Sequence, residues 1–191
     1  IAKNYIFGVT EDVNTANLKE LDLSPIVQEG DAQDAIDNVF GRDKMKFDVV
    51  IGNPPYQEEG KGEKSRDEPI YNYFIDEGIK LANKTMFITP GRFLFNVGQT
   101  PTKWNRKMLN DDHFKVVYFE QEGVKIFPNT DIKGGVVVTY YDKNHKLGPI
   151  GTFTPYDELA SIISKVVNNN YVSLNNIHYV RSSYKLSPVL F

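Results

Sequence analysis

The sequence predicts an α/β fold in which strands and helices alternate around a mostly parallel sheet. Short β-branched or aromatic runs, which suit buried strands, alternate with segments whose apolar residues recur at helical spacing. The clearest run is Val49, Val50 and Ile51, with charge before it and Gly-Asn-Pro after it. Two late apolar runs, 114–120 and 136–141, lie close enough along the chain to pair. We therefore expect a doubly wound sheet with a terminal antiparallel hairpin.

The individual elements follow from capping residues and from the spacing of apolar residues. Strands are expected at 5–9, 25–29, 47–52, 86–89, 114–120 and 136–141. Helices are expected at 14–22, 33–40, 69–82, 102–109 and 154–170. Because residues 5–9 already have the pattern of a buried strand, we expect the N-terminal strand of the domain to be missing from this chain, which is then a fragment of a larger protein.

The composition is that of a globular domain. With 191 residues, of which 40% are hydrophobic and 25% charged, the chain can bury a substantial core. The absence of cysteine excludes a disulfide framework and is consistent with a cytoplasmic protein. No apolar run reaches about 18 residues, so a membrane partner is not expected. The net charge of −3 means that contact with nucleic acid depends on local clusters such as 61–66, which is equally consistent with a solvated loop.

A rigid turn follows the central strand at Asn53, Pro54, Pro55 and Tyr56. Each proline has a fixed φ and no N–H, and it restricts the residue before it, so the turn is stiff and its carbonyls lack strand partners. The side-chain oxygen of Asn53 and the main-chain oxygen of Pro54 can both accept from one NH₂ group, while Tyr56 offers a flat face. Ligands of open α/β sheets bind beyond the carboxyl ends of strands. The turn therefore predicts a site for a planar amine; the alternative is a structural turn with a packing tyrosine.

Four segments in this order resemble one family of enzymes. They are Phe-Asp-Val-Val-Ile-Gly-Asn-Pro-Pro-Tyr-Gln at 47–57, the helix predicted at 69–82, the strand and turn at 85–93, and Phe-Pro-Asn-Thr-Asp-Ile-Lys-Gly-Gly at 127–135 with the strand that follows. Together they are similar to the amino-group DNA methyltransferases, in particular to the adenine-specific Eco57I-like restriction-modification enzymes. The resemblance covers roughly residues 1–145. It implies a Rossmann-like, S-adenosylmethionine-dependent methyltransferase fold.

The resemblance also implies a domain organisation and a function. Residues 1–153 would form the catalytic domain, which lacks the Gly-rich cofactor loop, and 154–191 a helix and the start of either a target-recognition region or another C-terminal region. The expected activity is transfer of a methyl group from S-adenosylmethionine to N6 of adenine in double-stranded DNA, within a restriction-modification enzyme that has an endonuclease or specificity domain or subunit as partner. Since the target base is unreachable within a duplex, it must flip out of the stack.

Roles for the residues of the turn follow from this resemblance. Asn53, Pro54 and Tyr56 are the expected catalytic residues, because two fixed acceptors can stabilise the charge that develops on the attacking nitrogen. Pro55 is expected to contact the base, together with a second aromatic side chain from the late strand. Tyr140 is the expected aromatic residue and Tyr141 the alternative, because alternation along a strand directs only one of them inward.

The motifs that bind the cofactor in this family are only partly present in the sequence. The Gly-rich loop that holds S-adenosylmethionine in this family is missing, and Gly134-Gly135 comes too late in the chain to replace it. The resemblance assigns Glu11 or Asp12 to the ribose hydroxyls and Asp31 to the adenine amine of the cofactor. Each of these carboxylates can equally serve as a helix cap.

Two other functions stay open on the sequence. Methyltransferases that act on a protein glutamine also present Asn-Pro-Pro-Tyr to a planar amide, and a domain that has lost cofactor binding can still recognise DNA. No metal site is expected, because His113, His145 and His178 are scattered singly along the chain.

Overall fold

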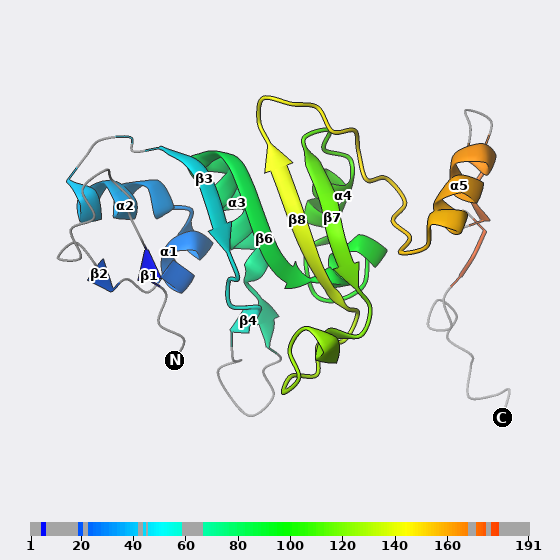
Figure 1. Cartoon of the computed structure of the whole chain (residues 1–191), viewed down its shortest axis with the longest axis horizontal. Helices are drawn as coiled ribbons and strands as arrows, with labels where there is room; N and C mark the ends of the chain where they lie inside the picture. Colours follow the sequence, from blue (N-terminus) through cyan, green and yellow to red (C-terminus); the bar gives the residue numbers. More distant parts are fainter. Residues whose placement is uncertain are drawn as a thin grey trace, which may run out of the picture. The chain divides into compact units, whose positions relative to one another are not determined.

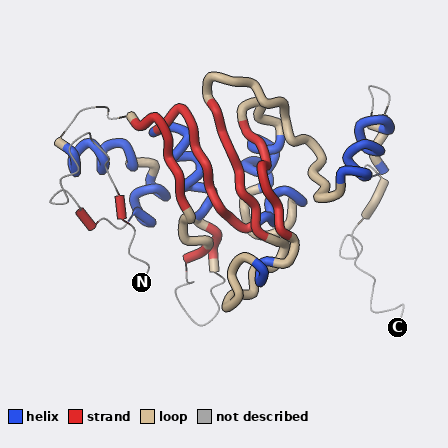
Figure 2. The backbone as a smooth tube through the Cα atoms, viewed as in Figure 1, coloured by secondary structure: helices blue, strands red, loops and turns tan. Residues whose placement is uncertain are grey.

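A computed structural model of the chain describes residues 5–6, 19–20, 23–41, 44, 46–58, 67–167, 171–174 and 177–179. The chain divides into two compact units, residues 1–153 and 154–191. The first unit contains the main sheet and the helices that pack on it (Figures 1 and 2). In the second unit the described helix is α5 (Asp157–Val166), none of whose residues is buried.

The main sheet has four described strands in the order β3-β6-β8-β7. Their bounds are β3 (Phe47–Gly52), β6 (Ala82–Pro90), β7 (Phe114–Glu120) and β8 (Val136–Asp142). β3 pairs with β6 in parallel, whereas β8 is antiparallel to both β6 and β7. It follows that β3, β6 and β7 point in one direction and that β8 runs against them. The expected α/β fold, with its mostly parallel sheet and terminal antiparallel hairpin, is confirmed.

Helix α3 (Tyr71–Leu81) is the crossover that joins the parallel strands β3 and β6, as parallel pairing requires. It packs so closely on β6 that a Cβ atom at Gly78 would lie 2.7 Å from Cζ of Phe87. The helix begins two residues later than predicted, because Glu68–Pro69 forms strand β5, which pairs with β4 (Gln57–Glu58). The backbone N–H of Ile70 then donates to the Tyr56 carbonyl at 3.3 Å, which fastens the start of α3 to the turn that follows β3.

Two clusters of buried side chains form the core of the first unit. The larger one packs α3, the 3₁₀ turn η2 (Gly91–Phe95) and α4 (Thr102–Leu109) on the sheet. It contains Tyr71, Ile75, Phe87, Phe93, Leu94, Trp104, Met108, Leu109, Phe114 and Val137. The smaller cluster joins helices α1 and α2 to α3. Its buried members are Val27, Ala32, Ile36, Ile70, Phe74 and Leu81.

The strand predicted at 25–29 is wrong, because these residues lie in helix α1 (Leu23–Glu29). Pro25 is in the first turn, where a helix tolerates a proline. The buried side chain of Val27 belongs to the smaller core cluster, so packing decides between helix and strand for this short apolar run. The helix ends at Gly30, which has a φ of +85° and donates its N–H to the Ile26 carbonyl at 3.1 Å.

The other N-terminal predictions fall partly outside the described residues. β1 (Tyr5–Ile6) pairs antiparallel with β2 (Lys19–Glu20), so the helix predicted at 14–22 is wrong at residues 19 and 20. The rest of that helix and residues 7–9 of the first strand lie outside the described residues. Helix α2 (Ala32–Phe40) begins one residue before its predicted start and ends at Gly41, where φ is +63°. None of the described helices has the length and apolar character needed to cross a membrane.

Candidate functional site

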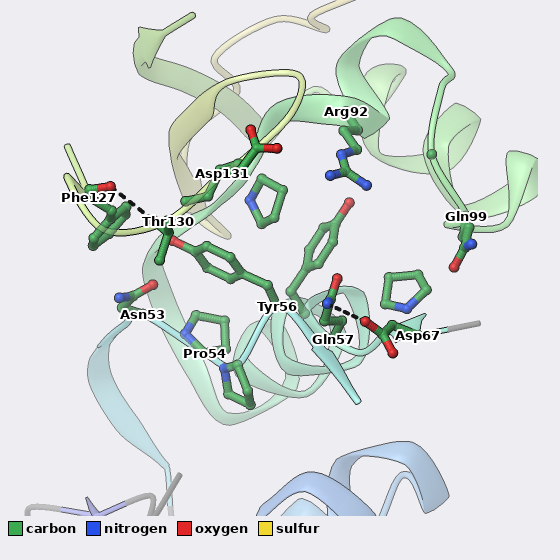
Figure 3. Close-up of a pocket in the computed structure, with 16 residues that line it drawn as sticks. Asn53, Pro54, Tyr56, Gln57, Asp67, Arg92, Gln99, Phe127, Thr130 and Asp131 are labelled. Carbon is green, nitrogen blue, oxygen red and sulfur yellow. Dashed lines mark hydrogen bonds between the residues drawn. The ribbon is translucent and has the colours of Figure 1, made fainter. Parts of the chain in front are cut away.

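A cleft of about 1020 Å³ opens at the carboxyl ends of β3 and β6 (Figure 3). Its walls come from five parts of the chain: the turn after β3, the segment that leads into α3, the turn after β6, the loop between η2 and α4, and the loop between η3 (Gly123–Lys125) and β8. The lining residues are Asn53, Pro54, Pro55, Tyr56, Gln57, Asp67, Pro69, Tyr71, Pro90, Arg92, Gly98, Gln99, Phe127, Thr130, Asp131 and Ile132. All four residues of the predicted amine site therefore lie together in this cleft.

The pairing of β3 with β6 positions the turn. Gly52, the last residue of β3, lies opposite Phe87 of β6, and a Cβ atom at Gly52 would approach the Phe87 ring to 3.3 Å. The chain then enters the turn with Pro54 buried and Asn53 exposed. Within the described part of the chain, no hydrogen bond occupies the Asn53 side chain. Its amide oxygen is therefore available to a ligand, on a backbone that two prolines hold stiff.

Tyr56 and Phe127 provide two aromatic surfaces in the cleft. Their ring centroids are 6.3 Å apart and the rings meet edge to face, at 75°. The Tyr56 hydroxyl is buried and has no hydrogen-bond partner among the described residues, and burial raises the pKa of this hydroxyl to about 12. Tyr56 is therefore a neutral aromatic side chain at physiological pH.

The loop that carries Phe127 is held by its own hydrogen bonds. The N–H of Phe127 donates to the Gly123 carbonyl at 2.9 Å, and the Phe127 carbonyl accepts from the N–H and the hydroxyl of Thr130, at 3.1 and 3.0 Å. Gly123 also lets the start of this loop lie close to Ile132, because a Cβ atom at position 123 would be 2.9 Å from Cβ of Ile132. These contacts shape the loop that carries the Phe127 ring to the cleft.

Tyr140 does not reach the cleft, contrary to the sequence-based expectation. It lies opposite Met86 and Lys115 within the sheet, and its hydroxyl donates to Oδ2 of Asp142 at 3.0 Å. β8 begins beside the cleft with Val136, which lies opposite Pro90, and then runs away from it. At about 3.3 Å per residue, Tyr140 is roughly 13 Å further along the strand. Tyr141 packs against the larger core cluster instead, so neither tyrosine meets the turn.

The carboxylates expected to bind the cofactor are not brought together by the described residues. Asp31 lies at the N-cap of α2, between two helices rather than after a strand, and it does not line the cleft. Its side chain makes no capping hydrogen bond, while its carbonyl accepts from Ala35 N–H at 3.1 Å. Glu11 and Asp12 lie outside the described residues, as does the basic cluster at 61–66. The described residues thus bring the hydrogen-bond acceptors of the turn into the cleft, but they do not form a site for S-adenosylmethionine.

The histidines do not build a metal centre in the described part of the chain. The imidazole of His145 contacts Oδ2 of Asp142 at 3.1 Å, and His113 contacts the Asp142 carbonyl at 2.9 Å, so both help to close the turn after β8. The described residues hold no group of three or more histidine, aspartate or glutamate side chains that could bind a metal ion.

Sequence reasoning missed two lining residues that the fold makes prominent. Phe127 lies in a segment that carries the family resemblance, but that resemblance favours an aromatic residue of the late strand, Tyr140, over one in the loop before it. Arg92 comes directly after Pro90-Gly91 at the end of β6. Because parallel neighbours end at the same edge of a sheet, the residues after β6 were predictable companions of those after β3.

The fold is an α/β domain whose cleft lies at the carboxyl ends of two parallel strands. Residues 3–127 match the family model of the Eco57I restriction-modification methylase. The match covers more than half of the chain, which therefore belongs to the Eco57I restriction-modification methylase family. The chain is also 28% identical over 109 residues to an uncharacterized adenine-specific methylase of Mycoplasma pneumoniae. That alignment covers 53% of this chain and 25% of the relative, so the chain spans about a quarter of the relative's length.

Proposed function

We propose that the protein is a site-specific DNA adenine N6-methyltransferase of a restriction-modification system. The observation that carries the proposal is the position of the Asn53-Pro54-Pro55-Tyr56 turn, which lines a cleft at the carboxyl end of β3 opposite the Phe127 ring. Membership of a methylase family and similarity to a protein named as an adenine-specific methylase support the same function.

The chemistry of the turn suits an exocyclic amine. The lone pair of adenine N6 is delocalised into the ring, so the nitrogen is a weak nucleophile. Both N–H groups of N6 can donate hydrogen bonds, one to Asn53 Oδ1 and one to the Pro54 carbonyl. These hydrogen bonds favour a more tetrahedral nitrogen. As the amine gains positive charge during transfer, these two fixed dipoles stabilise the charge without reorganising. Asn53 and Pro54 thereby orient and activate the amine.

The aromatic side chains suit the purine ring. An adenine that leaves the duplex loses its stacking and pairing, at a cost of a few kcal/mol. Stacking on an aromatic side chain is worth about 1–3 kcal/mol per base. Because Tyr56 and Phe127 meet edge to face, one ring can stack on the purine while the other contacts its edge, which offsets part of this cost. Phe127 replaces Tyr140 as the second aromatic residue in this proposal, because it is the one that lines the cleft.

S-adenosylmethionine is the proposed methyl donor, and it supplies an electrophilic methyl group. Since the described residues do not form its site, Asp31, Glu11 and Asp12 remain candidates for binding it rather than parts of an established pocket. Membership of the restriction-modification methylase family is the basis for proposing an endonuclease or specificity partner. Residues 154–191 are proposed to take part in target recognition.

The proposed function is tested by incubating the full chain with unmethylated duplex DNA and isotopically labelled S-adenosylmethionine. Label is expected in N6-methyladenine, and a release-factor protein offered in the same assay is expected to stay unlabelled. Asn53→Ala is expected to abolish transfer while leaving DNA binding largely intact. Asn83→Ala is the matched control, because Asn83 is an exposed asparagine at the opposite end of β6. Full activity of Asn53→Ala contradicts the assigned mechanism.

A further inference from the structure

Arg92 stands out because of its charge. Among the described residues that line the cleft it is the only one with a positive charge, and it shares the cleft with two carboxylates, Asp67 and Asp131. It enters the cleft from the turn after β6, whereas Asn53 enters from the turn after β3. Figure 3 shows the two side chains on different sides of the cleft. The amine site and this cation are therefore separate features of one cavity.

The stem of Arg92 is fixed by close packing. A Cβ atom at Gly134 would lie 2.7 Å from Arg92 Cγ, and one at Gly98 would lie 3.1 Å from Arg92 Cβ. Both glycines have positive φ, +85° and +98°, which disfavours any other residue at these positions. In addition, Arg92 Nε donates to the Lys133 carbonyl at 2.6 Å. The side chain is thus held between two turns, and its head group is presented to the cleft.

Within the part of the chain that the structure describes, the terminal amino groups of Arg92 make no hydrogen bond. Asp131 is 3.8 Å from the Lys133 ammonium, and Asp67 accepts from the Gln57 amide at 2.7 Å. No ion pair joins Arg92 to a carboxylate within the described part of the chain. Nε donates to a backbone carbonyl, so the donors that remain are the two terminal Nη groups of the guanidinium. Two parallel N–H groups, one from each Nη, match two oxygens of a phosphate.

We propose that Arg92 binds a backbone phosphate of the target strand next to the flipped nucleotide. This inference rests on the proposed function. A flipped nucleotide brings three chemical groups: an amine that suits Asn53 and Pro54, a purine that suits aromatic rings, and a phosphodiester that requires a cation. Arg92 supplies that cation at a fixed position. Because the chain has a net charge of −3, its binding to DNA depends on local contacts of this kind.

The test begins by locating the adenine that the wild-type chain methylates. Duplexes containing this site are then made with single phosphates replaced, one at a time, by neutral methylphosphonates. Wild type is expected to lose affinity about tenfold at one phosphate beside the target adenine, as for a hydrogen bond to a charged group. Arg92→Met is expected to bind the unmodified duplex about tenfold more weakly and to be insensitive to that same replacement.

Two further variants separate the contact from general effects. Arg92→Lys keeps the charge and is expected to retain part of the sensitivity to that phosphate. Arg106→Met removes the same charge from an exposed position on α4, outside the cleft, and is expected to show the wild-type profile.

Several results would overturn the proposal. One is an Arg92→Met variant with wild-type affinity and an unchanged phosphate profile. Another is a wild-type chain for which no phosphate beside the target adenine matters, and this result decides the question even if Arg92→Met fails to fold. A wild-type chain that methylates no DNA would overturn the proposed function and this inference together, so the two failures are distinguishable.

Discussion

The sharpest prediction concerns which aromatic residue stacks on the target adenine. Phe127 lines the cleft with its ring centroid 6.3 Å from that of Tyr56, whereas Tyr140 lies within the sheet and bonds to Asp142. Phe127→Leu and Tyr140→Leu remove the same kind of ring from these two positions. They form a matched pair, because each replaces a half-buried aromatic side chain with a branched aliphatic one.

The expected magnitude follows from the stacking contribution. Truncating a stacking ring costs about 1–3 kcal/mol per base, and leucine keeps part of the apolar contact, so a loss of about 1–2 kcal/mol is expected. For Phe127→Leu this corresponds to a fall of roughly 5- to 30-fold in kcat/KM. Phe127 belongs to neither core cluster, so the free energy of unfolding should change by less than about 1 kcal/mol.

The assay is steady-state methyl transfer to a duplex that contains the target site, with urea denaturation of each variant as the stability control. Tyr140→Leu is expected to keep kcat/KM within about twofold of the wild-type value, because its ring lies away from the base. The reasoning is refuted if Tyr140→Leu lowers kcat/KM as much as Phe127→Leu does while remaining folded. It is also refuted if Phe127→Leu transfers methyl groups at the wild-type rate.

Two predictions concern stability. Gly78→Ala should lower the free energy of unfolding by about 1–3 kcal/mol, measured by urea denaturation, because its Cβ atom would lie 2.7 Å from the buried Phe87 ring. Gly148→Ala is the complementary variant: no atom lies within 4 Å of its Cβ position but φ is +80°, so it tests backbone strain without overpacking. Burial raises the pKa of both Tyr56 and Tyr71 from 10.0 to about 12. The unfolded chain therefore loses these protons first, so stability should fall as pH rises from about 10 to about 12. For Tyr71→Phe, the free energy of unfolding, measured by urea denaturation at each pH, should fall less steeply between about pH 10 and about pH 12 than it does for the wild type. A slope equal to that of the wild type contradicts the assignment.

Several elements were predictable from local sequence alone. β3, α4 and β7 have the bounds that were expected, because each is a continuous apolar run or an amphipathic segment between clear boundary residues. The segment 25–29 was not predictable in this way. Its short apolar run fits a strand or a buried helix equally well, and the contact of Val27 with the smaller core cluster decides for a helix.

The sequence by itself determined the turn of the proposed amine site, because Asn53, Pro54, Pro55 and Tyr56 are consecutive and two prolines restrict their backbone wherever the turn is placed. Only the tertiary structure decided what faces that turn. β8 starts beside the cleft and leads away from it, which removes Tyr140, while the loop before β8 brings Phe127 and the end of β6 brings Arg92. Strand direction and register set these distances, and both depend on pairings between segments that are far apart in the chain.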